Sequence, residues 1–270
     1  MIGNMERIEV HFYGKTSVFF DIDGTLLDHD KKLPASTKAA VTRLKELGHE
    51  VALATGRAPF MFKDLLEELG IDSYISFNGS YVVHKGKPVY SRVLDKEELI
   101  RLTLFAEENA NPIIYENHEK MFANIESHPH MTAGIDSLKI NQAPIYDPAF
   151  YEKNDVYQLL LFCLEDMQDA YAAQFKKFEF VRWHQYSVDV LPAGGSKAKG
   201  VEAFIQHLNI PKKNVYAFGD GLNDIEMLTY VENSVAMGNS EPIVKGLAKY
   251  VTHPVDEDGI LKGLQLVGLL

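Results

Sequence analysis

The sequence contains only one cysteine, Cys163, and no long apolar run. A single cysteine rules out a disulfide bond within the chain and favours a reducing compartment. Cys163 lies in the apolar segment 159–164, where a small buried residue is a better interpretation than a nucleophile. That segment is much shorter than the roughly 18–20 apolar residues of a membrane span, and charges within residues 1–16 exclude a signal peptide. We therefore expect a soluble, cytoplasmic protein with no membrane partner.

Basic residues are also scarce, with 27 Lys and Arg against 38 Asp and Glu and a net charge of -11. A nucleic-acid partner is not expected, because phosphate backbones require clustered Lys and Arg. An acidic surface also repels an anionic substrate, so a phosphate site would need local positive charge from a lysine, backbone amides or a metal ion. A chain of 270 residues is long enough for one large domain or two smaller ones.

Short apolar runs alternate with amphipathic stretches, a pattern typical of an α/β fold with a parallel sheet. Buried strands are expected at 17–20, 51–54 and 75–77. The first intervening helix would be capped by Ser36 or Thr37 and followed by Gly48. The second would run through the apolar positions 62–69 and stop at the next glycine.

The pattern changes in the middle of the sequence, where a hairpin is expected around 85–87. Further short strands and helices indicate a separate α+β unit, with strands expected at 113–115, 121–123, 158–162 and 178–181, helices near 95–109 and 165–175, and a turn at 144–148. Parallel α/β character resumes after 188–192, with a helix at 197–208 and strands at 215–218 and 235–237. We expect a Rossmann-like core made of 1–82 and 187–270 and an inserted unit at 83–186.

The segment 21–27 (DIDGTLL) directly follows the first expected strand. Residues two apart in a strand-then-loop arrangement can point to the same side, so Asp21 and Asp23 are expected to share a site. Neighbouring carboxylates cannot both ionise cheaply without a cation, and hard oxygen ligands suit Mg²⁺. The alternative interpretation is a solvated turn, because Asp and Gly are common turn residues.

A second acidic segment, 219–224 (GDGLND), also follows a short apolar strand and is expected to open a helix. Loops that leave the carboxyl ends of parallel strands converge on one edge of the sheet, and that edge binds ligands. Asp220 is therefore expected to meet Asp21 and Asp23 around one metal ion.

Two further segments supply candidates for phosphate binding. Residues 55–57 (TGR) follow a strand and are expected to begin a helix, whose N-terminal amides attract anions. Lys197 adds positive charge at the expected start of another helix. Taken alone, Lys197 would be interpreted as a solvated surface lysine, but it stands in order with three other motifs.

In order, the segments DIDGT, TGR, SK and GDGLND resemble the motifs of the haloacid dehalogenase superfamily and, within it, the Cof-type sugar phosphatases. The resemblance spans nearly the whole chain. It implies a Rossmann-like core with an α/β cap inserted after the second motif, which agrees with the insertion expected from the change in pattern.

The resemblance also implies chemical roles. Asp21 resembles the nucleophile and Asp23 the general acid/base. Five residues resemble phosphate-binding positions: Ile22 and Gly56 through their backbone amides, with Thr55, Lys197 and Asn223. The cofactor would be Mg²⁺, held by Asp21, the carbonyl of Asp23 and Asp220. Asp224 would orient the lysine, and Arg57 and Asn78 are candidate substrate contacts.

Position 23 and the spacing of the motifs distinguish the branches of this superfamily. Relatives that pump cations or remove halogens lack an aspartate at this position, whereas phosphatases and mutases use it to protonate a leaving group. Only 32 positions separate Asp23 from Thr55, which leaves no room for a cap there. The expected activity is hydrolysis of a small phosphorylated metabolite by a monomer or small homo-oligomer. A phosphomutase and an inactive binding module are the alternatives, and the second would require a missing catalytic residue.

The inserted unit is the least readable part of the sequence. The segment 126–130 (ESHPH) fits no zinc pattern and is expected to form a surface loop. The segment 182–184 (RWH) is expected either to face the substrate or to pack, with neither interpretation favoured. A strand before Ser17 and a start at Met5 instead of Met1 also remain open.

Overall fold

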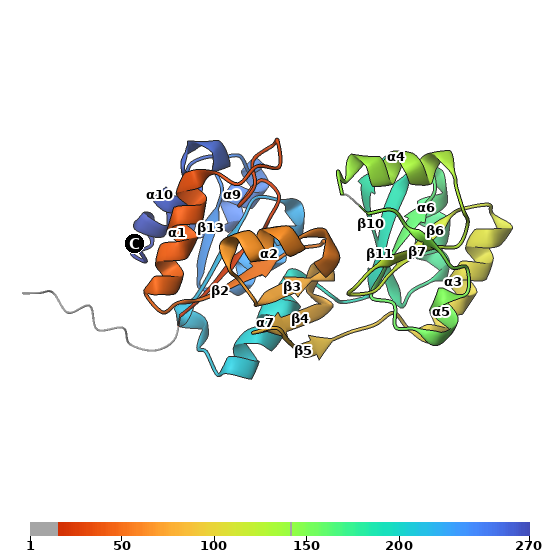
Figure 1. Cartoon of the computed structure of the whole chain (residues 1–270), viewed down its shortest axis with the longest axis horizontal. Helices are drawn as coiled ribbons and strands as arrows, with labels where there is room; N and C mark the ends of the chain where they lie inside the picture. The colour runs from red at the N-terminus through yellow and green to blue at the C-terminus, as the bar shows by residue number, and fades with distance from the viewer. Residues whose placement is uncertain (1–15, 141) are drawn as a thin grey trace, which may run out of the picture.

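The protein structure is a computed structural model that describes residues 16–140 and 142–270. Two β-sheets organise it into two units that lie side by side (Figure 1). The predicted α/β core with an inserted α+β unit is confirmed. The two open questions about the chain before Ser17 lie outside the described residues.

The first unit contains an eight-stranded sheet with the order β14-β13-β12-β1-β2-β3-β4-β5. Its strands are β1 (Ser17–Phe20), β2 (Glu50–Ala54), β3 (Tyr74–Ser76), β4 (Tyr81–His84), β5 (Lys87–Ser91), β12 (Val215–Gly219), β13 (Asn233–Ala236) and β14 (Tyr250–Val251). Every pair is parallel except β3–β4 and β4–β5. Parallel sheets of this kind are covered on both faces.

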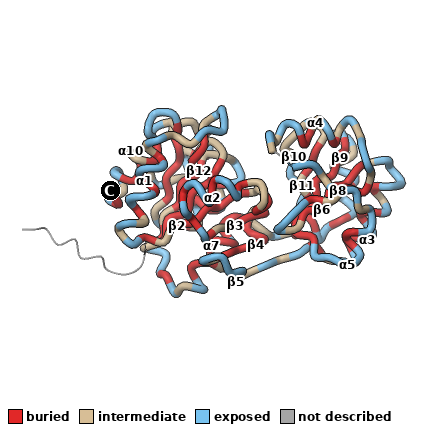
Figure 2. Tube along the Cα trace, in the orientation of Figure 1, coloured by how far each residue is buried: buried red, intermediate tan, exposed pale blue. Residues whose placement is uncertain are grey.

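Helices cover both faces of this sheet and bury alternate residues of β1. Val18 and Phe20 belong to one apolar cluster and Phe19 to the other, as the period of two in a strand requires. The helices of this unit are α1 (Ala35–Glu46), α2 (Lys63–Leu69), α7 (Lys197–Leu208), α8 (Ile225–Tyr230), α9 (Pro242–Leu247) and α10 (Gly259–Leu266). Figure 2 shows a separate buried core in each unit.

The second unit is built on a six-stranded sheet with the order β10-β11-β9-β6-β7-β8. Its strands are β6 (Ile113–Glu116), β7 (Met121–Ala123), β8 (Ile145–Tyr146), β9 (Gln158–Phe162), β10 (Phe178–His184) and β11 (Ser187–Pro192). Its helices are α3 (Lys96–Glu108), α4 (Pro129–Ser137), α5 (Phe150–Lys153) and α6 (Glu165–Gln174). We call this unit the cap.

The sheets divide the chain at places different from those predicted. The hairpin β4–β5 extends the first sheet by pairing with β3, and β11 lies between β9 and β10 in the second sheet. Strand membership therefore changes after Ser91 and after Pro192, whereas we predicted boundaries at 82/83 and 186/187. The sheet to which a hairpin belongs depends on the strand with which it pairs, and the local sequence pattern does not identify that strand.

The two crossings between the units are close together. The guanidinium of Arg92, just after β5, donates a hydrogen bond to the carbonyl of Ala193, just after β11. The backbone N–H of Arg92 donates to the carbonyl of Ser80 at 2.8 Å. The chain therefore enters and leaves the cap at neighbouring points.

Three local predictions differ from the structure: the cap of the first helix, the segment 126–130 and the end of the third strand. Helix α1 begins after Pro34, with no side-chain cap, and Thr37 is buried inside it. The segment 126–130 is not simply a loop, because α4 begins at Pro129, a residue well suited to the first turn of a helix. His128 caps that helix by accepting a hydrogen bond from the N–H of His130 at 3.2 Å.

The third expected strand also ends early, at Ser76. The following residues, Phe77 and Asn78, adopt left-handed backbone conformations, with φ of 50° and 49°. The turn thus leads the chain sharply away from the end of β3. Within residues 16–140 and 142–270, no helix combines the length and apolar character needed to traverse a bilayer.

Candidate active site

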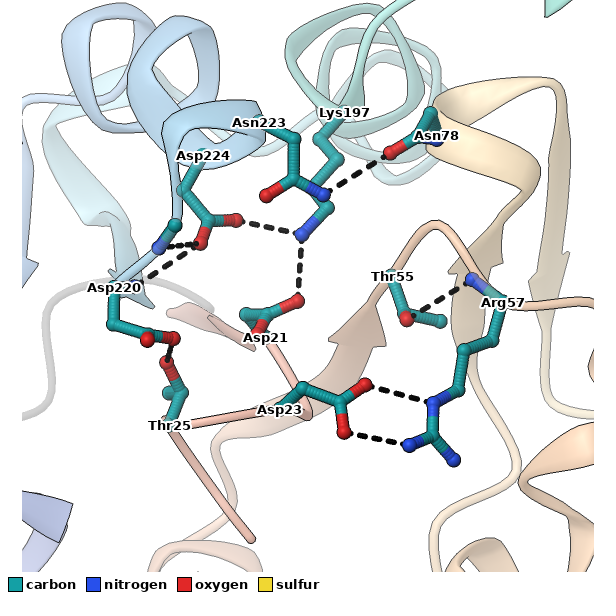
Figure 3. Close-up of polar contacts among 11 residues, drawn as sticks. Asp21, Asp23, Thr25, Thr55, Arg57, Asn78, Lys197, Asp220, Asn223 and Asp224 are labelled. Atoms are coloured by element: carbon teal, nitrogen blue, oxygen red, sulfur yellow. Dashed lines mark hydrogen bonds and ion pairs between the residues drawn. The ribbon is translucent and has the colours of Figure 1, made fainter. Parts of the chain in front are cut away.

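Three of the four sequence motifs follow neighbouring parallel strands at their carboxyl ends, and the fourth brings Lys197 to the same place from the start of α7. Asp21 follows β1, Thr55 follows β2 and Asp220 follows β12. Since β1 pairs in parallel with both β2 and β12, the three loops emerge at one edge of the sheet. Figure 3 shows the side chains of these loops gathered in one region.

A buried lysine lies at the centre of the site. The Nζ of Lys197 is 2.6 Å from Oδ1 of Asp21 and 2.7 Å from Oδ1 of Asp224 (Figure 3). Lys197 is the first residue of α7, and Ser196 caps this helix by accepting a hydrogen bond from the N–H of Lys199. Lys197 is only 1% exposed, so its long side chain reaches the site through the protein interior.

For both Asp21 and Lys197, burial and the neighbouring charges shift the pKa in opposite directions. Burial raises the pKa of Asp21 to about 8, against the opposing effect of Lys197. Burial alone would lower the pKa of Lys197, but Asp21 and Asp224 raise it above its ordinary value. Lys197 therefore carries its positive charge, and any further cation beside Asp21 would favour the carboxylate.

Asp220 is held on the other side of Asp21. Its carboxylate accepts hydrogen bonds from Thr25 Oγ1 at 2.9 Å and from Asn239 Nδ2 at 3.2 Å. Gly24 makes this approach possible, because a Cβ at that position would lie 2.2 Å from Oδ2 of Asp220. Burial raises the pKa of Asp220 to about 6, which the Thr25 hydrogen bond partly opposes.

The acidic group suits a divalent cation. Asp21, Asp220 and Asp224 each offer an oxygen atom, and these atoms lie within 4.8 Å of one another. When all three are ionised, three carboxylates against one lysine leave two negative charges, and an all-oxygen set suits a hard cation.

The three carboxylates differ in how far they are already engaged. Asp224 accepts from Lys197 with one oxygen and from the N–H groups of Asp220 and Gly221 with the other. Its geometry is therefore that of a residue that positions Lys197 and the 220–221 turn. Asp21 and Asp220 are the carboxylates better placed to hold an ion.

Asp23 points away from the acidic group and toward Arg57 (Figure 3). Arg57 Nε and Nη2 donate to the two Asp23 oxygens at 2.7 and 2.6 Å, and Lys31 Nζ lies 2.6 Å from Oδ1. Burial would raise the pKa of Asp23, but Arg57 and Lys31 outweigh it and lower the pKa below its ordinary value. In this arrangement Asp23 is a carboxylate.

The loop after β2 differs from the prediction. No helix begins at residues 55–57, because a short 3₁₀ segment, η1 (Pro59–Met61), follows and α2 starts only at Lys63. Thr55 is buried, and its Oγ1 accepts a hydrogen bond from the N–H of Arg57 at 3.2 Å. Any phosphate held here would therefore meet a loop, not the N-terminus of a helix.

Asn78 and Asn223 meet at the upper side of the site in Figure 3, where Asn223 Nδ2 lies 3.4 Å from Asn78 Oδ1. The left-handed conformation of Asn78 brings its amide against Gly56, where a Cβ would lie 2.9 Å from Nδ2. Such conformations in non-glycine residues are costly and often mark functional sites.

A pocket of about 260 Å³ opens between the core residues of the site and the cap. The core contributes Asp21, Asp23, Lys31, Thr55, Gly56, Arg57, Met61, Gly221 and Asn223. The cap contributes Ser137, Leu138, Gln158, Leu160, Trp183 and Asp189. Both units therefore surround whatever occupies the pocket.

The structure thus brings the predicted site residues into one region, in two groups. Asp21, Asp23, Thr55, Gly56, Arg57 and Asn223 line the pocket, whereas Lys197, Asp220, Asp224 and Asn78 lie behind or beside this lining. The side chain of Ile22 is fully buried in the core, which leaves only its backbone available for the predicted contact.

Three contacts of the site were not predicted: Lys31 contacts Asp23, Thr25 contacts Asp220, and Asn239 contacts both Asp220 and Gly24. Most of the cap residues that line the pocket were not predicted either. Lys31 had no visible signal, because it lies in an ordinary polar turn. Trp183 lines the pocket, whereas Arg182 donates to the carbonyls of Cys163, His184 and Gln185 and packs in the cap.

Comparison with known proteins gives a consistent result. Residues 18–264 match the family model described as haloacid dehalogenase-like hydrolase. The chain is 48% identical over 253 residues to the putative phosphatase YkrA of Bacillus subtilis, covering 94% of this chain and 98% of that protein.

Two solved structures are also similar. One is a hypothetical protein from Geobacillus kaustophilus, with a TM-score of 0.92 and 52% identity over 95% of this chain and 100% of that one. The other is the haloacid dehalogenase subclass IIB sugar phosphatase BT4131, with a TM-score of 0.82 and 30% identity over 95% of this chain and 100% of that one.

Proposed function

Because this chain belongs to the haloacid dehalogenase-like hydrolases, we propose that it hydrolyses small phosphorylated metabolites, such as sugar phosphates, with Mg²⁺ and through a phosphoaspartate at Asp21. The family and Cof-type branch predicted from the four ordered motifs are confirmed, as is the class of phosphoric monoester hydrolase. The substrate, the ion and the intermediate are the proposal.

The observation that carries this proposal is the buried Asp21–Lys197–Asp224 group beside Asp220. A carboxylate that must attack an anionic phosphate needs positive charge on both sides of the reacting atoms. Lys197 supplies one such charge, and the excess negative charge around Asp21 and Asp220 suits a cation that would supply the other. A purely structural ion pair would not need the third carboxylate.

The proposed reaction has two steps. An Asp21 oxygen attacks phosphorus, the ester P–O bond breaks, and Asp23 gives its proton to the leaving alkoxide. Asp23 then takes a proton from a water molecule, whose oxygen attacks phosphorus, and the bond between phosphorus and Asp21 breaks. A bound Mg²⁺ would offset charge on the phosphoryl oxygens, while Lys197 holds Asp21 in place and Thr55 and Asn223 orient the phosphate.

Asp23 must gain a proton before the first step, although Arg57 and Lys31 favour its ionised form. We infer that substrate phosphate competes for the Arg57 guanidinium, since bidentate binding of phosphate is a usual role of arginine. This competition weakens the contact with Asp23 when substrate is present.

Arg57→Gln is expected to move the alkaline limb of the pH profile to higher pH. Removing the guanidinium raises the Asp23 pKa, so the protonated acid persists at higher pH, by about one unit. The measurement is kcat/KM for glucose 6-phosphate between pH 3 and 8, because kcat/KM reports the free enzyme, in which the Asp23 pKa lies below its ordinary value. Arg43→Gln, an exposed arginine paired with Glu46, is the control and should match the wild type. An unshifted limb in Arg57→Gln would contradict the assignment of Asp23.

The proposal is tested by phosphate release from p-nitrophenyl phosphate and a panel of sugar phosphates, with Mg²⁺ and with EDTA. Turnover that requires the metal and releases free phosphate without an acceptor supports a phosphatase. Turnover that survives EDTA rejects the metal, and transfer of phosphate to another sugar, without release, would indicate the mutase.

Mg²⁺ binding is also expected to stabilise the protein, and Asp220→Asn should remove most of this effect. A ligand at 100 times its Kd adds about 2.7 kcal/mol to the free energy of unfolding. The measurement is the thermal unfolding midpoint with and without Mg²⁺, which needs no turnover. Asp169→Asn, at an exposed position of α6, should keep the Mg²⁺ response. An equal response in Asp220→Asn would place the ion elsewhere.

A further inference from the structure

The cap side of the pocket is formed by adjacent strands of the second sheet. β11 pairs with both β9 and β10, and Asp189 on β11 is directly opposite Leu160 on β9. Gln158 lies two residues before Leu160 and therefore on the same face. Asp189, Leu160 and Gln158 all line the pocket.

Gln158 carries a polar atom that has no hydrogen-bond partner in the part of the chain that the structure describes. The residue is 3% exposed, and its Nε2 donates to Glu116 Oε2 at 3.0 Å. Its Oε1 is buried and makes no hydrogen bond to the residues that the structure describes. Leaving a buried carbonyl unpaired is costly, which points to a ligand that supplies a donor.

Two carboxyl groups accompany this amide, the buried Glu116 and the half-buried Asp189. Burial raises the pKa of Asp189 to about 8 and that of Glu116 well above its ordinary value. Trp183 directs its indole nitrogen toward Asp189 without reaching ordinary hydrogen-bond geometry. Throughout 16–140 and 142–270, no Lys, Arg or His forms an ion pair with either carboxyl group.

The pocket is therefore electrostatically divided. Lys31 and Arg57 line its core side, with Lys197 behind them, so that side suits phosphate. Among the described residues that line it, the cap side offers oxygen acceptors, the ionisable carboxyl group of Asp189 and the indole N–H of Trp183, but no Lys, Arg or His. A second anionic group placed there would meet acceptors and carboxylates without compensation.

We propose that Asp189 and Gln158 bind hydroxyl or amine donors of the leaving group, so that the enzyme selects neutral or cationic sugar-like phosphate esters and rejects those with a second anionic group. This inference rests on the proposed phosphatase function. The small volume of the pocket, about 260 Å³, fits a leaving group of the size of one sugar.

Three hexose-derived phosphates of similar size separate the alternatives. Glucitol 6-phosphate is neutral at its far end, glucosamine 6-phosphate is cationic and 6-phosphogluconate is anionic. We expect kcat/KM for each of the first two to exceed that for 6-phosphogluconate by at least about tenfold. A higher kcat/KM for glucosamine 6-phosphate than for glucitol 6-phosphate would indicate that Asp189 forms an ion pair with the amine. Equal kcat/KM values for these two substrates would indicate that Asp189 binds hydroxyl groups.

Asp189→Asn should lower kcat/KM for glucitol 6-phosphate and glucosamine 6-phosphate, and this fold-decrease should be at least about ten times the fold-decrease for p-nitrophenyl phosphate. The ratio of kcat/KM for these two sugar phosphates to kcat/KM for 6-phosphogluconate should also become smaller. Asp169→Asn is the matched control and should retain the wild-type ratios. Gln158→Met, which keeps the volume and removes the acceptor, is a second variant if the first does not fold.

The outcomes distinguish the inference from the function on which it rests. If wild type releases no phosphate from any ester, including p-nitrophenyl phosphate, the proposed function fails and the inference fails with it. If wild type is active but hydrolyses 6-phosphogluconate as well as glucitol 6-phosphate, the inference alone is wrong. The same conclusion follows if both cap variants change all substrates equally.

Discussion

Asp21→Asn is expected to reduce phosphate release by at least about 10⁴-fold, the scale typical of losing a catalytic nucleophile. An amide cannot form the phosphoaspartate, so the covalent route is lost altogether. The measurement is kcat for p-nitrophenyl phosphate at saturating Mg²⁺. This substrate has a good leaving group, so its hydrolysis depends little on proton donation and reports mainly on the nucleophile.

The fold should survive this change. Burial raises the pKa of Asp21 to about 8, which means that its ionised form is costly in the native protein, and asparagine has nearly the same shape. Lys197 keeps its contact with Asp224. Asp169→Asn is the control for an isosteric change at an exposed aspartate and should keep full activity. Activity within tenfold of wild type in Asp21→Asn would show that another group attacks phosphorus.

Lys197→Met is expected to remove both activity and stability, lowering the free energy of unfolding by about 3–5 kcal/mol. Breaking a buried ion pair from one side leaves Asp21 and Asp224 without the cation that lies 2.6 and 2.7 Å from them. Urea denaturation followed by circular dichroism measures the loss. Lys199→Met, on an exposed neighbour paired with Glu202, is the matched control and should unfold nearly as wild type does.

This loss of stability should depend on pH. Without Lys197, Asp21 loses the cation that opposes the effect of burial on its pKa, so the pKa of Asp21 in the folded variant lies above the wild-type value of about 8. Above pH 8 the folded variant therefore binds more protons than the folded wild type, and the deficit of Lys197→Met should be larger at pH 9.5 than at pH 7. An equal deficit at the two pH values would attribute it to packing.

The core of the site was predictable because its residues sit in short motifs directly after buried strands. Asp21 and Asp220 each follow an apolar run, and parallel topology alone brings the ends of such strands together. The order of the motifs also revealed the importance of Lys197, although a single lysine at a helix start carries little information. The convergence of Asp21 and Asp220 needed only local pattern and one rule of topology, whereas the role of Lys197 was implied by the resemblance to the superfamily.

The cap was less predictable because its residues act through distant partners. Asp189 stands in the sequence as one polar residue within an apolar strand, and only the packing of the two units reveals that it lines the pocket. The β4–β5 hairpin was assigned to the wrong sheet for the same reason. His128 and Pro129 lie at the start of α4, whereas the sequence was interpreted there as a surface loop and the proline was not considered as a residue of the first helical turn.

The contact between Arg92 and Ala193 has a consequence for how this protein can change over time. A segment whose two ends are adjacent can be replaced by another of different length or shape without altering the geometry of its host. The residues proposed for phosphate transfer all precede the first crossing or follow the second. Selection can therefore remodel substrate preference as a separable module, and a protein engineer can graft a relative's cap between the same two positions.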